Sequence, residues 1–591
     1  MNFTRREIIR RLAGVSVIGA LWASSRYTLD QGQGEPSSEV LAKSGPSGRE
    51  GRGRTPSEAR SGSTRPDRGL SAEAGSSTTT TQPAETTSTL PAETDTTAAT
   101  DTTAAPDSET TTTEEAATTT EQPPTGGDIE LSGKIGPLTV AAGTTAMIVG
   151  DVDLNGDLTV LGKLIGTDSF TIEGNGNQIE VMNGGQVDLR GKPVSAWVSS
   201  DAPAGWVNGD RVVSTSVMPG RYAAADFKVS QWPAPAALVS LGAGPAMTAE
   251  IANLDRSIVI NNVKRFVFHN GAGKQTLKHI AVTNSGVTGQ LGLYPVHFHE
   301  NGGTTRGSLV EGVVVENGKN HAFVPHGSHG ISFIDCVAYN TIETPFWWDL
   351  PEGRTHTFNN SDDILWKHCL AAVVVPVGNG IRLTGFMMGA GSGNVCVDSV
   401  ATGVQGGKDS SGFQWPEQTN NNIGGNVWTF DGCIAHNNKA HGIFTWQNDN
   451  SVHPVKNFVA YGNGDSGIDH GAYVNRYHYE GMTLTDNGSF CIQSHALGKG
   501  DESIIFEDIT ATEPLMIGRH TLEGGPVIYK NCKFPSVLVD EGNKLPSTQR
   551  FENCGVTPDD FDMVSIASGT RLEILEGGAL KWSWEGDWKQ A

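Results

Sequence analysis

The chain has few cysteines, few charged residues and no long helical pattern. Its 591 residues hold 7 cysteines, and no two are spaced as Cys-x-x-Cys, which excludes the common zinc-binding patterns. An odd count at repeated strand positions also favours free, buried thiols over a disulfide framework. No helical periodicity follows the first 28 residues, while glycine is abundant, at 74 residues. These absences leave an all-β protein as the predicted class.

Positive charge is missing from one long segment and scarce in the rest. Residues 69–133 contain 12 Asp and Glu but no Lys or Arg, whereas residues 1–68 contain 12 Lys and Arg and 7 Asp and Glu. The total net charge of −23 therefore leaves −16 on residues 134–591. A body this acidic argues against a nucleic-acid partner. It also means that an acidic polysaccharide would need a local cationic patch or a bridging metal.

The N-terminal part predicts export followed by a spacer. A twin arginine, Arg5-Arg6, precedes a short apolar run from Leu12 to Ala23, which is typical of a bacterial signal of the twin-arginine type (residues 1–28). An ordinary secretory signal is the alternative, and both predict a secreted or cell-surface protein. Residues 29–127 are rich in Thr, Ser and Pro and have almost no large apolar residues, so we expect a disordered stalk. Beyond the signal, no membrane-spanning segment is expected.

The remaining chain repeats a short pattern. A strand ends in Asp, Gly or Asn, then Cys or an aliphatic residue, then Ala or Thr, as in Ile334–Asn340, Phe430–Asn437 and Val455–Asn463. Later copies recur at about 20–27 residues, the spacing of solenoid coils. We therefore predict a right-handed parallel β-helix over residues 216–575, with a short tail at 576–591. Two irregular β-sandwiches are the disfavoured alternative.

Histidines gather in one part of this repeat. His297 and His299 are two residues apart on a predicted strand and so project to one face. Glu300 follows directly, and His326 comes about one coil later. The sequence around this group, Tyr294-Pro-Val-His-Phe-His299, then His326-Gly-Ser-His-Gly330 and Val337-Ala-Tyr-Asn340, resembles the β-helical core of the cell-migration-inducing hyaluronan-binding proteins and fibrocystin.

The resemblance carries several implications. Residues 130–215 are similar to the eight-glycine domain that precedes the β-helix in that family, which predicts a β-rich cap. The family implies hyaluronan binding and depolymerisation, with calcium as the metal. This chain departs from the family pattern at three places: Leu293 replaces an Arg, Gly303 replaces an Asp, and of the acidic residues in the following segment only Asp349 remains.

Three functional hypotheses stay open at this stage. His297, His299 and Glu300 could hold a divalent metal. Asp349 with another carboxylate could act as acid and base on a glycosidic bond. An imidazole, His299 or His326, could transfer the proton.

The expected sugar contacts come from aromatic and basic side chains, namely Trp347, Trp348, Arg354 and Trp446. The alternative for each histidine is a hydrogen-bonded packing role between coils. The predicted function is an exported protein that binds an extracellular polysaccharide. The chain is then either a degrading enzyme (a glycoside hydrolase or lyase) or a non-catalytic binding or adhesion protein.

Overall fold

The computed structural model describes residues 128–586, apart from the short gaps 200–202, 234–237, 240–246, 348–360, 379, 416–426, 446–451, 472–473, 499 and 543. The predicted signal (1–28) and stalk (29–127) lie outside these residues. No helix in the described part of the chain is long and apolar enough to cross a membrane. The only helical pieces there are three 3₁₀ turns, η1 (Ala224–Asp226), η2 (Gly303–Thr305) and η3 (Pro558–Asp560).

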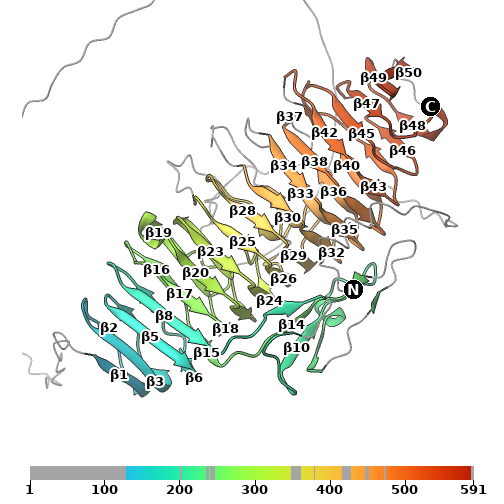
Figure 1. The fold of residues 1–591 in the computed structure, drawn as a ribbon. Coiled ribbons are helices and arrows are strands. Elements are labelled where there is room, and N and C mark those ends of the chain that lie inside the picture. The colour runs from blue at the N-terminus through green and yellow to red at the C-terminus, as the bar shows by residue number, and fades with distance from the viewer. Residues whose placement is uncertain are drawn as a thin grey trace, which may run out of the picture. The chain divides into compact units, whose positions relative to one another are not determined.

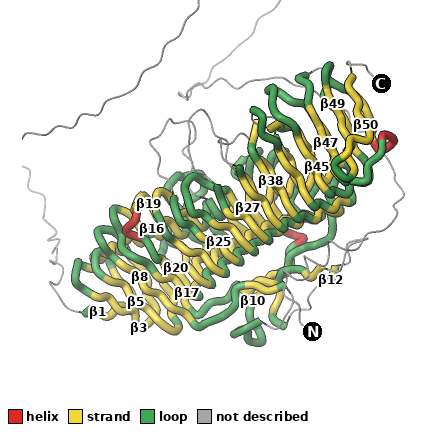
Figure 2. The backbone as a smooth tube through the Cα atoms, turned by 45° about the horizontal axis from the view of Figure 1, so that its top comes forward, coloured by secondary structure: helices red, strands yellow, loops and turns green. Residues whose placement is uncertain are grey.

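Successive coils stack so that each strand pairs in parallel with its counterpart one coil later, in three ladders (Figures 1 and 2). The parallel β-helix is therefore confirmed, because a sandwich would pair its strands antiparallel. Strands β1 and β3 are long enough to run through both of the first two ladders. These are β1 (Ile129–Ile135) and β3 (Thr145–Leu154).

The strands of ladder 1 are β5 (Lys163–Asp168), β8 (Gln186–Gly191), β17 (Thr276–Lys278), β20 (Ser308–Glu311), β23 (Ile331–Ile334), β25 (Leu365–Lys367), β28 (Val395–Val397), β31 (Thr429–Asp431), β34 (His453–Lys456), β38 (Tyr477–Glu480), β42 (Ile504–Glu507), β45 (Val527–Lys530), β47 (Thr548–Glu552) and β49 (Thr570–Glu576). The strands of ladder 2 are β6 (Phe170–Glu173), β15 (Ile258–Asn261), β18 (Ile280–Thr283), β21 (Val314–Glu316), β24 (Val337–Ile342), β26 (Leu370–Val375), β29 (Val400–Val404), β32 (Ile434–His436), β35 (Val459–Tyr461), β39 (Thr483–Thr485) and β43 (Thr510–Ala511).

The strands of ladder 3 are β2 (Leu138–Val140), β4 (Leu158–Val160), β7 (Ile179–Val181), β16 (Phe266–His269), β19 (Val296–Gly302) and β22 (Phe323–Ser328), and, further along the axis, β27 (Thr384–Met387), β30 (Ser411–Trp415), β33 (His441–Thr445), β36 (Ser466–His470), β40 (Phe490–Ser494), β44 (Leu515–Ile517), β46 (Val537–Asp540) and β48 (Phe561–Ser565). Between β22 and β27 the ladder narrows to single bridges from Phe346 to Phe323 and to Phe386. Two short pairs lie outside the ladders, β12 (Leu238–Val239) with β13 (Met247–Thr248), and β37 (Val474–Asn475) with β41 (Leu497–Gly498).

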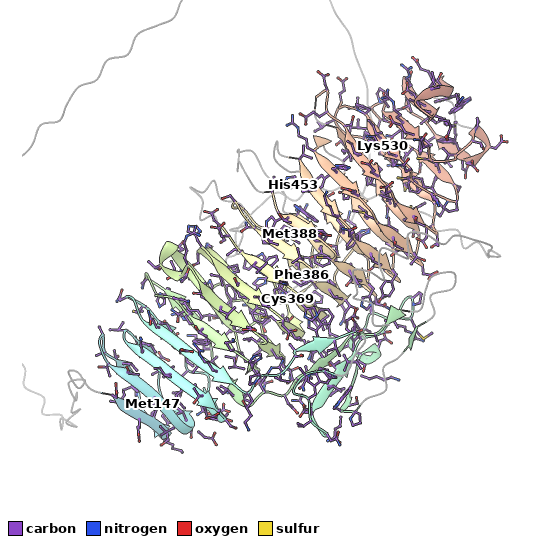
Figure 3. All side chains as sticks on the ribbon, viewed as in Figure 1. Met147, Cys369, Phe386, Met388, His453 and Lys530 are labelled. Atoms are coloured by element: carbon purple, nitrogen blue, oxygen red, sulfur yellow. The ribbon has the colours of Figure 1, made fainter. Side chains whose placement is uncertain are left out.

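The repeat in the sequence corresponds to the corner between ladders 1 and 2. One residue there adopts a left-handed backbone, for example Asp335 (φ 54°) and Asn531 (φ 52°), and the next side chain points inward. Asn and Asp tolerate this conformation better than most residues, which explains their recurrence. Cys336, Cys369 and Cys433 follow such corners and are fully buried (Figure 3 labels Cys369). All seven cysteines are free thiols, as predicted, and only Cys554 is half-buried.

The parallel ladders begin at Ile129, well before the predicted boundary at residue 216. The eight-glycine-like region is continuous with the β-helix, because β5 pairs with β8 and β6 pairs with β15 in unbroken register. The turns between its short apolar runs are corners of coils, not boundaries of a separate cap. The interruption comes later, at residues 192–257, which are inserted at the corner between β8 and β15.

This insertion forms a four-stranded antiparallel sheet of β9 (Trp197–Val198), β10 (Arg211–Ser214), β11 (Lys228–Gln231) and β14 (Ile251–Asn253). It packs on the outer face of ladder 2, where Trp197, Val213 and Phe227 meet apolar side chains of β21 to β35. From β21 to β35, ladder 2 is consequently buried on both faces, as parallel strands usually are.

The C-terminal residues also form regular structure. β50 (Ala579–Gly586) pairs antiparallel with β49 and covers the last coil. Residues 579–586 of the predicted C-terminal tail therefore form a strand. Covering the open edge of the final coil protects its unpaired backbone groups, a need that local composition does not reveal.

Candidate functional site

Three histidines converge on the outer face of ladder 3. Along β19 the side chains of Val296 and Phe298 point into the core, so the alternating His297 and His299 point outward. His299 is in register with His326 of β22, one coil further along. Each of the three rings offers a nitrogen, and these nitrogens all lie within 4.8 Å of one another. We call His297, His299 and His326 the histidine group.

His297 is held like a metal ligand. Its side chain is 1% exposed, and its Nδ1 lies 3.3 Å from the backbone oxygen of Gly292, to which it can donate a hydrogen bond. Its Nε2 is buried and has no hydrogen-bond partner among the described residues. Burial lowers the pKa of His297 well below its usual value, with smaller contributions from His299 and His326. The neutral ring therefore presents a lone pair toward its two neighbours.

The local sequence explains this geometry. Gly292 has φ 78°, which turns the preceding loop so that its carbonyl faces His297. Tyr294 is fully buried and its ring meets that of His297 edge-on at 4.7 Å. These contacts orient one ring nitrogen by fixing the other, an arrangement that is also common around metal-bound histidines.

Glu300 is not part of the histidine group. The pairing of β19 with β22 shifts register between His299 and Gly302, and Glu300 has φ 50°. Its prediction as a ligand rested on its place directly after His299, but its side chain is exposed and it does not join the three clustered histidines. Its assignment to the metal shell is not supported by this geometry.

Trp347 is also not an open sugar platform. It is 8% exposed and lies in a small apolar cluster with Tyr294, Val324, Met387 and Ala390. Its ring stacks on His321 at 3.8 Å. Trp348, Asp349, Arg354 and Trp446 lie outside the described residues, so the proposed acid and three of the four proposed sugar contacts stay predictions.

In the later coils of ladder 3, His441 and His470 lie inside the core. His470 is fully buried, its Nδ1 lies 3.2 Å from the hydroxyl of Tyr479, and burial lowers its pKa to about 3. Its neighbour Asp469 lies with Oδ2 3.4 Å from Nε2 of His441. His470 is thus a packing residue. The structure favours the earlier coils as the functional face.

Sequence reasoning missed His269 of β16. It is in register with His299, so His269, His299 and His326 form a single file along three successive coils. Their spacings of 30 and 27 residues are close to one coil and could have revealed the file. His269 Nε2 lies 3.9 Å from Oε1 of Glu180 on β7, and that carboxylate also pairs with Arg265.

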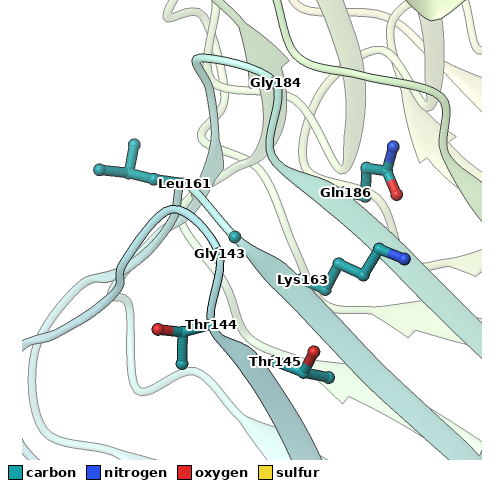
Figure 4. A pocket seen from close by; sticks show the side chains of 8 residues that line it. Gly143, Thr144, Thr145, Leu161, Lys163, Gly184 and Gln186 are labelled. Carbon is teal, nitrogen blue, oxygen red and sulfur yellow. The ribbon is translucent and has the colours of Figure 1, made fainter. Parts of the chain in front are cut away.

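A separate hollow lies near the start of the β-helix (Figure 4). Corner residues contribute to its lining, and the polar side chains among its lining residues are Thr144, Thr145, Lys163 and Gln186. A single lysine with two hydroxyls and an amide offers neither a metal shell nor an acid–base pair. This hollow is distinct from the histidine group.

Comparison with known proteins matches the same part of the chain. Residues 265–360 match the family model described as CEMIP beta-helix. The predicted family resemblance is confirmed. The CEMIP-type segment runs from β16 to the coil after β24 and contains His269 and the whole histidine group. No curated protein matches the chain.

Solved structures with some likeness are phage tailspikes. The tailspike protein gp49 of Pseudomonas phage LKA1 is 12% identical, with a TM-score of 0.17 and 73% of each chain covered. The Gp54 tailspike of Acinetobacter baumannii bacteriophage AP22, solved with a capsular saccharide, is 9% identical, with a TM-score of 0.19 and 73% of this chain and 74% of that chain covered. At such TM-scores nothing about this chain's site follows from them.

Proposed function

We propose that this chain is an exported carbohydrate-active protein that binds an extracellular polysaccharide and depolymerises it at a divalent metal. The observation that carries the proposal is the histidine group, in which three ring nitrogens lie within 4.8 Å of one another. The family match over residues 265–360 supports a polysaccharide of the hyaluronan type as the first substrate to test.

The donor set indicates which metal would fit. Three imidazole nitrogens suit zinc and the neighbouring transition metals, whereas calcium requires six to eight oxygen ligands. The histidine group therefore does not fit calcium, which the family resemblance implied. A zinc-class ion bound by three protein ligands keeps an open position and can polarise a substrate oxygen or lower the pKa of a bound water.

Each histidine of the group would contribute one nitrogen to the proposed metal site. His297 supplies a buried, neutral nitrogen whose orientation is set by Gly292 and Tyr294. His299 and His326, both half-buried, complete the group from adjacent coils. Because the body is acidic, it repels an anionic polymer, and a bound metal cation would offset this repulsion at the site.

A non-catalytic binding or adhesion protein is the second candidate function. It is favoured by one observation: in the described residues no carboxylate joins the histidine group. Such a protein would need the metal for binding but would not cleave the chain.

One experiment separates the two functions. Bound zinc would be measured on the full chain after dialysis. The chain would then be incubated with hyaluronan and other polysaccharides, with and without a chelator, and the viscosity and reducing ends of each polysaccharide would be measured. The variants are His297→Ala and His299→Ala. His478→Ala is a matched control, because His478 lies on β38 beside Glu507 at 2.9 Å, away from ladder 3.

We expect both site variants to lose zinc and polysaccharide binding while the control keeps them. Loss of viscosity with new reducing or unsaturated ends supports the enzyme, and binding without cleavage supports the adhesion protein. Unchanged zinc and polysaccharide binding in a folded double variant would refute the site.

A further inference from the structure

A second polar group lies on ladder 3 directly beside the histidine group. It consists of Gln178 and Glu180 on the β7 coil and Arg265 and His269 on the β16 coil, and we call it the β7–β16 group. The strand register places Glu180 opposite Val267, with Arg265 and His269 two positions to either side of Val267. All four side chains therefore project from the same outer face as His297 and His299.

The β7–β16 group is held in place by its own contacts. Arg265 donates to Oε1 of Gln178 at 3.0 Å and to the carboxylate of Glu180. Gln178 in turn donates to Asp157 at 3.0 Å. Arg265 and Glu180 are 27% and 14% exposed, so both are partly withdrawn from water yet reachable from outside.

Two polar atoms of this group, one on His269 and one on Glu180, remain available for a further hydrogen bond. The Nε2 atom of His269 is buried and has no hydrogen-bond partner among the described residues, since Glu180 lies 3.9 Å away. Both described contacts of the Glu180 carboxylate use Oε1, which leaves Oε2 for another donor. Leaving such capacity unused in a half-buried place is costly unless a ligand or water fills it.

The position of the group relates it to the proposed metal. His269 is the register neighbour of His299, and adjacent strands of a sheet lie about 4.7–4.9 Å apart. A polysaccharide running along the axis and bound at the histidine group would therefore lay its next sugar over β7 and β16.

The charges indicate what kind of sugar this would be. The Arg265 guanidinium is matched by the Glu180 carboxylate, so the pair presents donors and acceptors without net charge. Such a set suits the hydroxyl groups of a neutral pyranose, whereas a carboxylate-bearing sugar would meet Glu180 unfavourably.

We propose that the β7–β16 group is a subsite for a neutral sugar unit next to the metal-bound unit, which rests on the proposed function. Glu180 accepts hydrogen bonds from its hydroxyls and His269 donates to them, while Arg265 with Gln178 holds Glu180 in place. The substrate is accordingly a polymer in which at least one unit beside the bound one is uncharged.

The test uses the full chain loaded with zinc, and the variants His269→Ala and Glu180→Gln. Isothermal titration would measure affinity for a hyaluronan octasaccharide, which alternates neutral and acidic units, and for an alginate octasaccharide, which has only acidic units. His478→Ala serves again as the control, because it removes a half-buried histidine beside a glutamate on ladder 1.

We expect each variant to keep one zinc and its melting temperature, and to bind the hyaluronan octasaccharide about tenfold more weakly. Binding of the alginate octasaccharide should not weaken in either variant, and it should tighten in Glu180→Gln, which removes the carboxylate that an acidic unit meets. Unchanged hyaluronan affinity in both zinc-loaded variants would overturn the subsite. So would loss of zinc from His269→Ala, because His269 would then be a ligand. Failure of the proposed function gives a different result, in which His299→Ala keeps its zinc or the unaltered chain binds neither octasaccharide.

Discussion

Replacing His470 should change how stability depends on pH. His470 lies on the inner face of β36, fully buried, with Tyr479 as a hydrogen-bond partner. Burial lowers its pKa from 6.5 to about 3. Between these values the unfolded chain binds a proton that the folded chain excludes, so the folded state loses stability as pH falls.

The magnitude follows from the two pKa values. Above pH 6.5 the ring is neutral in both states, and the stability is fully present. At pH 5 the unfolded chain gains about 2 kcal/mol from protonation, and near pH 3 the gain approaches about 5 kcal/mol, at 1.36 kcal/mol per unit of pKa shift. The pH window in which this contribution is lost therefore runs from about 6.5 down to about 3.

The variant His470→Gln cannot take up this proton. Its free energy of unfolding in urea would be measured at pH 8 and at pH 5 beside that of the unaltered chain. At pH 8 we expect the variant to be less stable by about 1 kcal/mol, since it weakens the contact with Tyr479. At pH 5 the difference should shrink or reverse, by about 2 kcal/mol. An unchanged difference between the two pH values would refute the reasoning.

Three further predictions test the core and the site. Under native conditions a thiol reagent should label at most Cys554, which is half-buried and whose pKa is lowered by a hydrogen bond from Cys532. All seven thiols should react after unfolding. Rapid labelling of Cys336 or Cys433 in the folded chain would contradict their burial. Phe386→Ala should lower the free energy of unfolding in urea by about 3–5 kcal/mol, because Phe386 stacks between Phe346 and Phe413 with ring centroids at 4.3 and 4.9 Å. Phe490 is only half-buried, so Phe490→Ala should lower it clearly less. Zinc affinity of the full chain should fall as pH is lowered, because imidazole ligands must be neutral to bind the metal, and a pH-independent affinity would contradict histidine ligation.

Local pattern alone was enough for the architecture. The corner residues Asp335 and Asn531 and the inward cysteines repeat at one coil's length, and only stacking can bury such a pattern, so the β-helix was predictable. The shared face of His297 and His299 was predictable for the same reason, because strand alternation has a period of two. The composition of residues 1–127 likewise supports its predictions of a signal and a stalk, which lie outside the described residues.

Tertiary structure decided everything that depends on which coil lies beside which. The sequence spacing places His326 about one coil after His299, but only the register aligns the two and brings Glu180 and Arg265 beside them from earlier coils. It also left Glu300 exposed and outside the group, beside a shift in pairing, and buried Trp347 against His321. The length of each corner and insertion sets these neighbours, and the 66 residues inserted at 192–257 show that length in sequence is a poor guide to distance in a solenoid.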